Sequence, residues 1–233
     1  MTTISAVDTF AARLRGVTGD AASKFASIEV PRGTVVQAAG GRPAMVYLLE
    51  SGAAKVCVQA PDGRNVIAGL LRGGALINAA AALAGTATMT RVATVVPTRL
   101  MAMPRPWFIE QVGNSPAFGP LIHQAISFEL NGLYSCIGAL ITEPASQRLC
   151  RLLTQMIDPD EAGNAVSRVS PWLTRDEMAE SIGCTRVYLT KLLTRLEEDG
   201  RITRRRGWIL IRTSGPRGGV AQAPVHKPRG QGN

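Results

Sequence analysis

The stretch LTRDEMAESIGCTRVYLTKLLTRLEEDGRITRRRGWILI, residues 173–211, decides how the C-terminal part of the chain folds. Thr174 is followed three residues later by Glu177, the spacing of a capping box in which each side chain accepts a hydrogen bond from the other residue's backbone N–H. Gly183 can take the left-handed conformation of a tight turn, and Thr185 can cap a second helix. The apolar residues of the first helix are Leu173, Met178 and Ile182. The stretch therefore predicts two helices joined by a glycine turn.

The second of these helices has an apolar and a polar face. Its leucines recur at helical spacing, at Leu189, Leu192, Leu193 and Leu196. Its other face carries residues that could reach a base edge, namely Arg186, Val187, Tyr188, Thr190 and Lys191. A recognition helix needs this distribution, because its N-terminal side chains read the major groove while its apolar face fixes its angle on the domain. The pattern predicts a DNA-binding helix-turn-helix.

A short hairpin is expected after this helix. Gly200 ends the helix, and two apolar segments then flank Arg204, Arg205, Arg206 and Gly207. Three arginines at a hairpin tip suit contact with DNA phosphates, although any one of them alone could be a solvated surface charge. The acidic run before Gly200 is expected to point away from the DNA; it consists of Glu197, Glu198 and Asp199. The C-terminal segment thus predicts a winged helix-turn-helix.

Composition sets limits on the other functions. The 233 residues carry a formal net charge of +9, which attracts polyanions but also serves solubility. No apolar run approaches the roughly 20 residues of a membrane helix, and the N-terminus does not resemble a signal peptide, so we expect a cytoplasmic protein without a membrane partner. The four cysteines lack metal-ligand spacing, and the two histidines cannot form a metal cluster or a catalytic triad. We predict no cofactor, no metal and no enzymatic activity.

The N-terminal part has the rhythm of an all-β domain. Between residues 25 and 103, short apolar runs alternate with glycine-containing turn signals about every ten residues, which is typical of an antiparallel sandwich or barrel. Asp62-Gly63 suits a hairpin turn. Asn78 and the alanine-rich residues 79–83 break the rhythm and suit a single helical turn. We expect a β-domain over residues 1–112.

A long helix follows, over residues 113–143. Apolar residues in it recur with 4-3-4-3 spacing, at Ile126, Leu130, Leu133, Ile137 and Leu140. This heptad seam suits packing against a second copy of the chain; the alternative is a single core helix in a monomer. Pro144 then starts a new helix that leads into the winged domain over residues 144–212, and residues 158–170 are expected to form a loop. The glycine- and proline-rich tail, residues 213–233, is expected to be disordered. The predicted fold class is α+β.

The order of β-roll, long helix and winged helix resembles the CRP/FNR family of bacterial transcription regulators. The residues that carry the resemblance are Gly33, Tyr47-Leu48-Leu49-Glu50-Ser51-Gly52, Asp62-Gly63-Arg64, Gln147-Arg148-Leu149, Ile182-Gly183-Cys184-Thr185-Arg186 and Leu196-Glu197-Glu198-Asp199-Gly200. The resemblance implies a homodimer that binds palindromic double-stranded DNA and recruits or blocks RNA polymerase. It also implies that Thr174, Arg175 and Thr185 contact phosphates.

The same resemblance assigns the base-reading positions. Arg186 corresponds to the family's guanine-reading arginine, and Lys191 replaces a second base-reading arginine. Val187 stands where the family usually has a glutamate. A glutamate accepts from the cytosine amino group, whereas valine can only touch a thymine methyl. The resemblance therefore predicts a half-site that departs from the common family sequence.

The effector pocket departs further from the cyclic-nucleotide-binding members. Asn78 stands at the position of the ribose-binding glutamate, and Thr88 and Met89 stand where arginine and serine would meet the cyclic phosphate. Leu133 and Tyr134 replace the small hydroxyl residues that meet the adenine. A buried phosphate without its arginine is costly, so we predict a degenerate pocket with no known effector. The alternative is a functional receptor for a cyclic nucleotide or another metabolite.

Cys184 is the thiol of most interest. It lies next to the N-terminus of the predicted recognition helix, where the helix dipole favours a thiolate and oxidation could disturb DNA binding. The alternative is a small buried turn residue.

Overall fold

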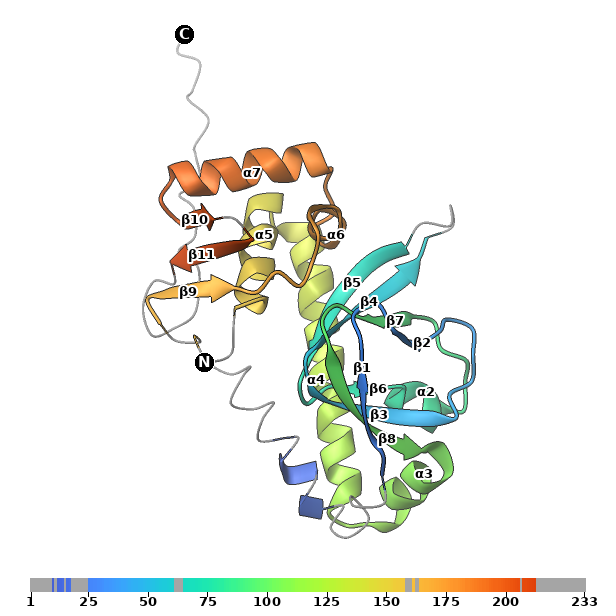
Figure 1. Ribbon diagram of the computed structural model, residues 1–233. Coiled ribbons are helices and arrows are strands. Elements are labelled where there is room, and N and C mark those ends of the chain that lie inside the picture. Colours follow the sequence, from blue (N-terminus) through green and yellow to red (C-terminus); the bar gives the residue numbers. More distant parts are fainter. Residues whose placement is uncertain are drawn as a thin grey trace.

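The computed structural model describes residues 10, 12–14, 16–17, 25–60, 65–157, 161, 164–205 and 207–212. This part of the chain forms a β-sheet domain, a long helix beside it, and a helical domain with a small sheet (Figure 1). The α+β class is as predicted. The Asp62-Gly63 turn, Arg206 and residues 213–233 lie outside the described residues.

The β-domain consists of two four-stranded antiparallel sheets, in the orders β1-β8-β3-β6 and β2-β7-β4-β5. The strands are β1 (Ser27–Val30), β2 (Val35–Gln37), β3 (Met45–Ser51), β4 (Ala53–Gln59), β5 (Asn65–Arg72), β6 (Leu76–Ile77), β7 (Arg91–Thr94) and β8 (Thr98–Pro104). Side chains from both sheets, among them Leu49, Ile77 and Val92, form a common buried cluster. The alternating apolar pattern thus predicted the sandwich correctly.

Three helices accompany the sandwich in the described chain. Helix α2 (Ala79–Ala84) begins after Asn78, as predicted, and α3 (Arg105–Asn114) follows β8 directly. Helix α4 (Phe118–Thr142) starts later than the predicted residue 113, because residues 105–114 form a separate helix. Phe108 of α3 and Phe118 of α4 meet edge to face, with ring centroids 5.8 Å apart. These aromatic contacts attach the start of α4 to the β-domain.

The C-terminal domain begins after the break at Glu143 and Pro144. Its elements are α5 (Ala145–Gln155), β9 (Val166–Val169), α6 (Arg175–Ser181), α7 (Arg186–Glu198), β10 (Ile202–Arg205) and β11 (Trp208–Arg212). The strands form a sheet in the order β10-β11-β9. The prediction of a loop over residues 158–170 is wrong for β9. That strand is short, but Ser167 and Val169 alternate inward and pair with β11.

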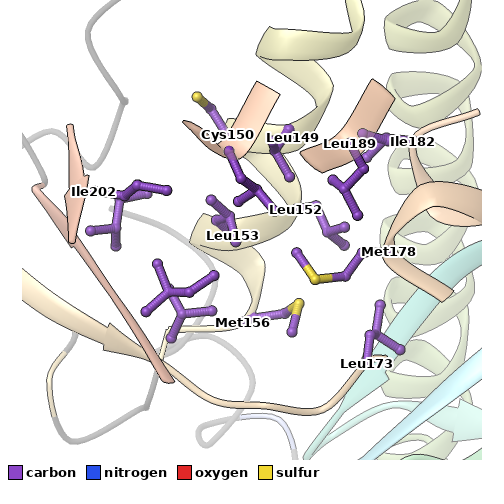
Figure 2. Packing of buried hydrophobic residues seen from close by; sticks show 14 of the residues in the cluster. Leu149, Cys150, Leu152, Leu153, Met156, Leu173, Met178, Ile182, Leu189 and Ile202 are labelled. Carbon is purple, nitrogen blue, oxygen red and sulfur yellow. The ribbon is translucent and has the colours of Figure 1, made fainter. Parts of the chain in front are cut away.

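One apolar core holds this domain together (Figure 2). Leu149, Leu153 and Met156 of α5 meet Met178 and Ile182 of the α6 segment in the same buried cluster. The core also receives Leu189, Leu192, Leu193 and Leu196 of α7 and Ile202, Ile209 and Ile211 of the hairpin. The two helices of the predicted helix-turn-helix are therefore fixed against α5 and the sheet.

The β-domain packs directly on the C-terminal domain. Arg72, at the end of β5, donates to the carbonyl oxygens of Gln155 (2.8 Å) and Ile157 (2.9 Å). Its guanidinium lies 4.7 Å from the ring centroid of Trp172, a cation–π distance. Lys55 of β4 donates to the carboxylate of Glu177 on α6. These polar contacts tie the first helix of the helix-turn-helix to the sandwich.

Candidate nucleic-acid interface

The helix-turn-helix has the local geometry that the sequence predicts. The backbone N–H of Thr174 donates to Glu177 Oε2 (2.7 Å), and the N–H of Glu177 donates to Thr174 Oγ1 (3.2 Å), so both halves of the capping box form. Gly183 has φ of 64°, the left-handed conformation that glycine adopts without strain. Thr185 Oγ1 accepts from the N–H of Tyr188 (3.2 Å) and caps α7. These contacts fix the angle between the two helices.

Helix α7 separates its two faces as predicted. All four of its leucines are buried, and Leu193 has no exposed surface. Val187 is 69% exposed and Tyr188 is 48% exposed. Arg186, Thr190 and Lys191 are also exposed. In Figure 1, α7 lies at the end of the molecule away from the β-domain, and no labelled helix or strand covers its outer side in this view. The candidate base-reading residues thus share one accessible surface.

Several cationic groups converge around the start of α7. Thr174 and Arg175 lie exposed at the start of α6. Burial, together with the charges of Arg204 and Arg186, lowers the pKa of the Arg175 guanidinium. Three arginines from α6, α7 and β10 therefore lie close enough to repel one another. Such a surface favours polyanion binding, because a phosphate relieves the repulsion.

Acidic partners moderate this surface, and sequence reasoning missed them. Asp176 Oδ2 lies 3.3 Å from Arg186 Nη1. Glu197 Oε2 lies 2.6 Å from Arg204 Nη2. The carboxylate of Glu197 therefore balances the charge of Arg204 on β10. Neither pair has a local sequence signal, since each joins residues on different elements.

The wing is the hairpin of β10 and β11. Arg205 is paired in register with Trp208, and Gly207 in the turn has φ of 89°. Arg205 is exposed, whereas Arg204 is half-buried on the strand rather than at the tip. The structure thus brings Arg204 and Arg205 to the same hairpin but in different surroundings.

The heptad seam of α4 is largely uncovered in the single chain. Leu130, Leu133, Ile137 and Leu140 are exposed, and so are the flanking residues Phe128, Tyr134 and Ile141. Ile126 is half-buried and packs partly on the core of its own β-domain. By length and composition, α4 is also the one described helix that could cross a membrane. Its first turns, however, bury Phe118, Leu121 and Ile122 inside the folded domain.

The three candidate phosphate and ribose positions do not converge on a cationic site. Thr88 is buried, and its hydroxyl donates to the carbonyl oxygen of Ala38 (2.6 Å). Met89 is 88% exposed. Asn78 has φ of 74° and donates to the carbonyl oxygen of Met45 (3.0 Å), while its Oδ1 is buried without a hydrogen-bond partner. Asparagine, threonine and methionine side chains carry no positive charge, and neither Asn78 nor Thr88 has its side-chain donor free in the described structure.

The remaining candidate chemistry is limited. Burial raises the pKa of the Cys184 thiol, and the positive charge of Arg148 only partly opposes this. Of the two interpretations of Cys184, this favours a turn residue over a reactive thiolate. Among the described residues, no group of three His, Cys, Asp or Glu side chains could hold a metal ion.

Arg148 of α5 connects the break between α4 and α5 with the helix-turn-helix. Its Nε donates to the carbonyl oxygen of Ile182 (2.9 Å), and its Nη1 donates to the carbonyl oxygen of Glu143. Arg151 pairs with the carboxylate of Glu143. Beside these arginines, a cavity of about 180 Å³ lies between β5, α4, α5 and α6. Two arginines of α5 thus bind Glu143 at this break, and one of them also binds the turn of the helix-turn-helix.

A β-sandwich beside a long helix, followed by a winged helix-turn-helix, defines a DNA-binding transcription regulator and not an enzyme. Residues 27–114 match the profile of the cyclic nucleotide-binding domain, and residues 147–213 match that of the Crp-like helix-turn-helix domain. The chain belongs to the CRP/FNR family of transcription regulators.

Individual relatives agree with this family. The chain is 23% identical over 186 residues to the CRP-like cAMP-activated global transcriptional regulator of Mycobacterium tuberculosis, covering 79% of this chain and 80% of that protein. The structure resembles the c-di-GMP responsive global regulator CLP of Xanthomonas campestris, with a TM-score of 0.67, 18% identity and coverage of 84% and 98%. It also resembles FixK2 of Bradyrhizobium japonicum, with a TM-score of 0.69, 16% identity and coverage of 81% and 92%. These solved structures share the fold.

Proposed function

We propose that the chain binds palindromic double-stranded DNA as a symmetric homodimer and regulates transcription without a cyclic nucleotide. The observation that carries the proposal is the division of α7 into a buried leucine face and an exposed face led by Arg186. The family's helix-turn-helix supports DNA as the partner. Regulation takes place in the cytoplasm, through recruitment or obstruction of RNA polymerase at the bound promoter.

Base readout in this proposal comes from the exposed start of α7. Arg186 donates to a guanine, Val187 contacts a thymine methyl, and Lys191 supplies a further donor. The Arg186→Ala variant should lose discrimination at one guanine by about 1–3 kcal/mol, measured against duplexes that differ at that base pair. If Arg186→Ala keeps the specificity of the wild type, α7 is not the reading helix.

Phosphate contacts in this proposal come from the elements around α7. The contributing residues are Thr174, Arg175, Thr185 and the wing residues Arg205 and Arg206, while Tyr188 and Thr190 lie with the base-reading residues on the exposed face of α7. The exposure of Thr174 and Arg175 at the start of α6 and of Arg205 on the wing supports these assignments. Phosphate contacts hold the register of the helix but carry no sequence information.

The dimer in this proposal forms along the heptad seam of α4. Four seam leucine and isoleucine side chains are 43–49% exposed in the single chain, which is uncommon for a contiguous apolar row on a monomer. A two-fold axis along α4 would bury them and place two copies of α7 one helical turn apart on DNA. The exposure of the seam disfavours the alternative of a core helix in a monomer.

The effector pocket in this proposal is altered. The Thr88 hydroxyl already donates to the carbonyl oxygen of Ala38, and the Met89 side chain is exposed. Both observations support the absence of a cyclic-phosphate site. Isothermal titration calorimetry with cyclic AMP and with cyclic GMP tests this directly. A dissociation constant below about 10 μM for either nucleotide would overturn it.

A second candidate is a receptor β-domain that binds a different small molecule. The buried and unpartnered Oδ1 of Asn78 favours it, because an orphan acceptor can receive a ligand's hydroxyl or amino group. The Mycobacterium tuberculosis relative is named as cAMP-activated and the Xanthomonas campestris relative as c-di-GMP responsive, so ligand chemistry varies among similar proteins. A shift in the thermal unfolding midpoint on addition of a metabolite would favour this candidate.

A further inference from the structure

A carboxylate of the recognition helix, that of Glu197, contacts the wing. The backbone N–H of Arg204 donates to Glu197 Oε1 (2.9 Å), and Arg204 Nε donates to Glu197 Oε2 (2.7 Å). Arg204 Nη2 also reaches Thr194 Oγ1 (3.3 Å), one turn earlier on α7. Both carboxylate oxygens of Glu197 are therefore occupied by one wing residue.

The position of β10 explains why this contact matters. Strand β10 is the outer strand of the sheet β10-β11-β9, so one side of its backbone has no neighbouring strand. The N–H of Arg204 faces that side and would otherwise need water. Glu197 satisfies it from the last turn of α7. The sheet edge and the recognition helix are thus fixed to each other by hydrogen bonds that involve a charged group, which are stronger than neutral ones.

The two neighbouring wing arginines differ in the charge they can offer. Arg204 is half-buried and its charge is balanced by Glu197. Arg205 points to the opposite side of the strand and is exposed. Within the described part of the chain, Arg205 has no ion pair. Of the two β10 arginines that the structure describes, Arg205 is therefore the one whose charge has no ion-pair partner to compete with a phosphate.

We propose that Glu197 is a positioning residue that holds the wing on the recognition helix through Arg204, and that Arg205, rather than Arg204, contacts a phosphate. This inference rests on the proposed DNA binding and deepens it. Arg204 is then a structural member of the wing rather than a contributor to the electrostatic part of DNA affinity.

The salt dependence of DNA binding separates these roles. Each phosphate neutralised on duplex DNA contributes about 0.9 to the slope of log K against log salt concentration. Arg205→Gln should reduce the magnitude of the slope by about 0.9 for each protomer bound. Arg204→Gln should weaken binding while leaving the slope of the wild type. An equal loss of slope in both variants would show that Arg204 contacts a phosphate and would overturn the inference.

Glu198 provides a matched control for Glu197. The two residues are adjacent and carry the same charge, but among the described residues Glu198 is exposed and has no hydrogen bond or ion pair with the wing. Removing either charge should strengthen attraction to DNA slightly. Glu198→Gln should therefore bind as well as the wild type or better, whereas Glu197→Gln should bind about tenfold more weakly, the equivalent of one lost charged hydrogen bond. Equal affinity of the two variants would contradict the positioning role.

A measurement without DNA keeps this inference separate from the proposed function. Hydrogen–deuterium exchange of the Arg204 amide in the full chain should accelerate in Glu197→Gln and remain unchanged in Glu198→Gln, with thermal unfolding confirming that both variants fold. If the wild type binds no duplex but Arg204 exchanges as expected, the proposed function fails and the attachment stands. If the Arg204 amide exchanges equally in both variants, the attachment fails whatever the DNA result.

Discussion

Substitutions on the two faces of α7 should have opposite effects: a buried-face change should lower stability, and an exposed-face change should alter base preference. Leu193 has no exposed surface and packs in the core formed with α5 and the hairpin. Truncating a buried leucine to alanine costs about 2–5 kcal/mol, because the apolar contacts are lost and a cavity remains. Leu193 is surrounded on all sides, so we expect a loss of about 3 kcal/mol.

That loss translates into a large thermal shift. A domain of roughly 60–100 residues loses about 4–8 °C of its midpoint for each kcal/mol, so Leu193→Ala should lower the midpoint of the C-terminal domain by at least about 12 °C. Differential scanning calorimetry of the full chain measures this. At temperatures well below its midpoint, where the variant is folded, it should keep the sequence preference of the wild type.

Val187→Ala is the counterpart on the exposed face. Val187 is 69% exposed, so its loss should change the free energy of unfolding by no more than about 0.5 kcal/mol. It should instead alter the preference at one base pair, since the proposed contact with a thymine methyl disappears. A destabilisation by Val187→Ala as large as that by Leu193→Ala, or an unchanged midpoint in Leu193→Ala, would refute the assignment of the two faces.

Two further predictions concern the domain contact and the dimer. Burial alone would raise the pKa of Glu177, but hydrogen bonds from Lys55 and the helix N-cap outweigh burial and lower the pKa in the folded protein below the usual 4.5. The contribution of this carboxylate to stability is therefore complete above about pH 4.5 and is lost as the pH falls through the lowered pKa. Glu177→Gln should therefore unfold at lower temperature at neutral pH but show a flatter loss of the midpoint below pH 4.5; the same acid dependence in both proteins would contradict this. The double variant Leu133→Asp and Ile137→Asp should raise the dimer dissociation constant at least about 100-fold in analytical ultracentrifugation, because each charge is costly in an apolar seam. Asn131→Asp is the control: it adds a charge beside the seam and should stay dimeric. A dimeric double variant would place the interface elsewhere.

The helix-turn-helix was predictable because its signals are local. The capping box joins Thr174 and Glu177 only three residues apart, and Gly183 and Thr185 act within their own turn. The leucine spacing of α7 gives its buried face directly. The alternating strands of the β-domain were predictable for the same reason, since a period of two residues is visible in the sequence.

The contacts between different elements were not predictable. Glu197 and Arg204 are only seven residues apart, but they meet because the hairpin folds back on α7, and Lys55 meets Glu177 across 122 residues of chain. Residues 166–169 pair with β11, but a four-residue segment with only two valines, preceded by a polar stretch, was too short to predict this strand. Local patterns carry no information about such partners.

Selection of binding sites from random duplex DNA by the full-length protein tests the central claim most directly. The exposed start of α7 and the uncovered seam of α4 predict an enriched palindrome whose half-sites lie about 10 base pairs apart, each with a guanine that loses its enrichment in Arg186→Ala. Failure to enrich any sequence at physiological salt, with the protein folded and dimeric, would contradict the assignment of α7 as a DNA-reading helix.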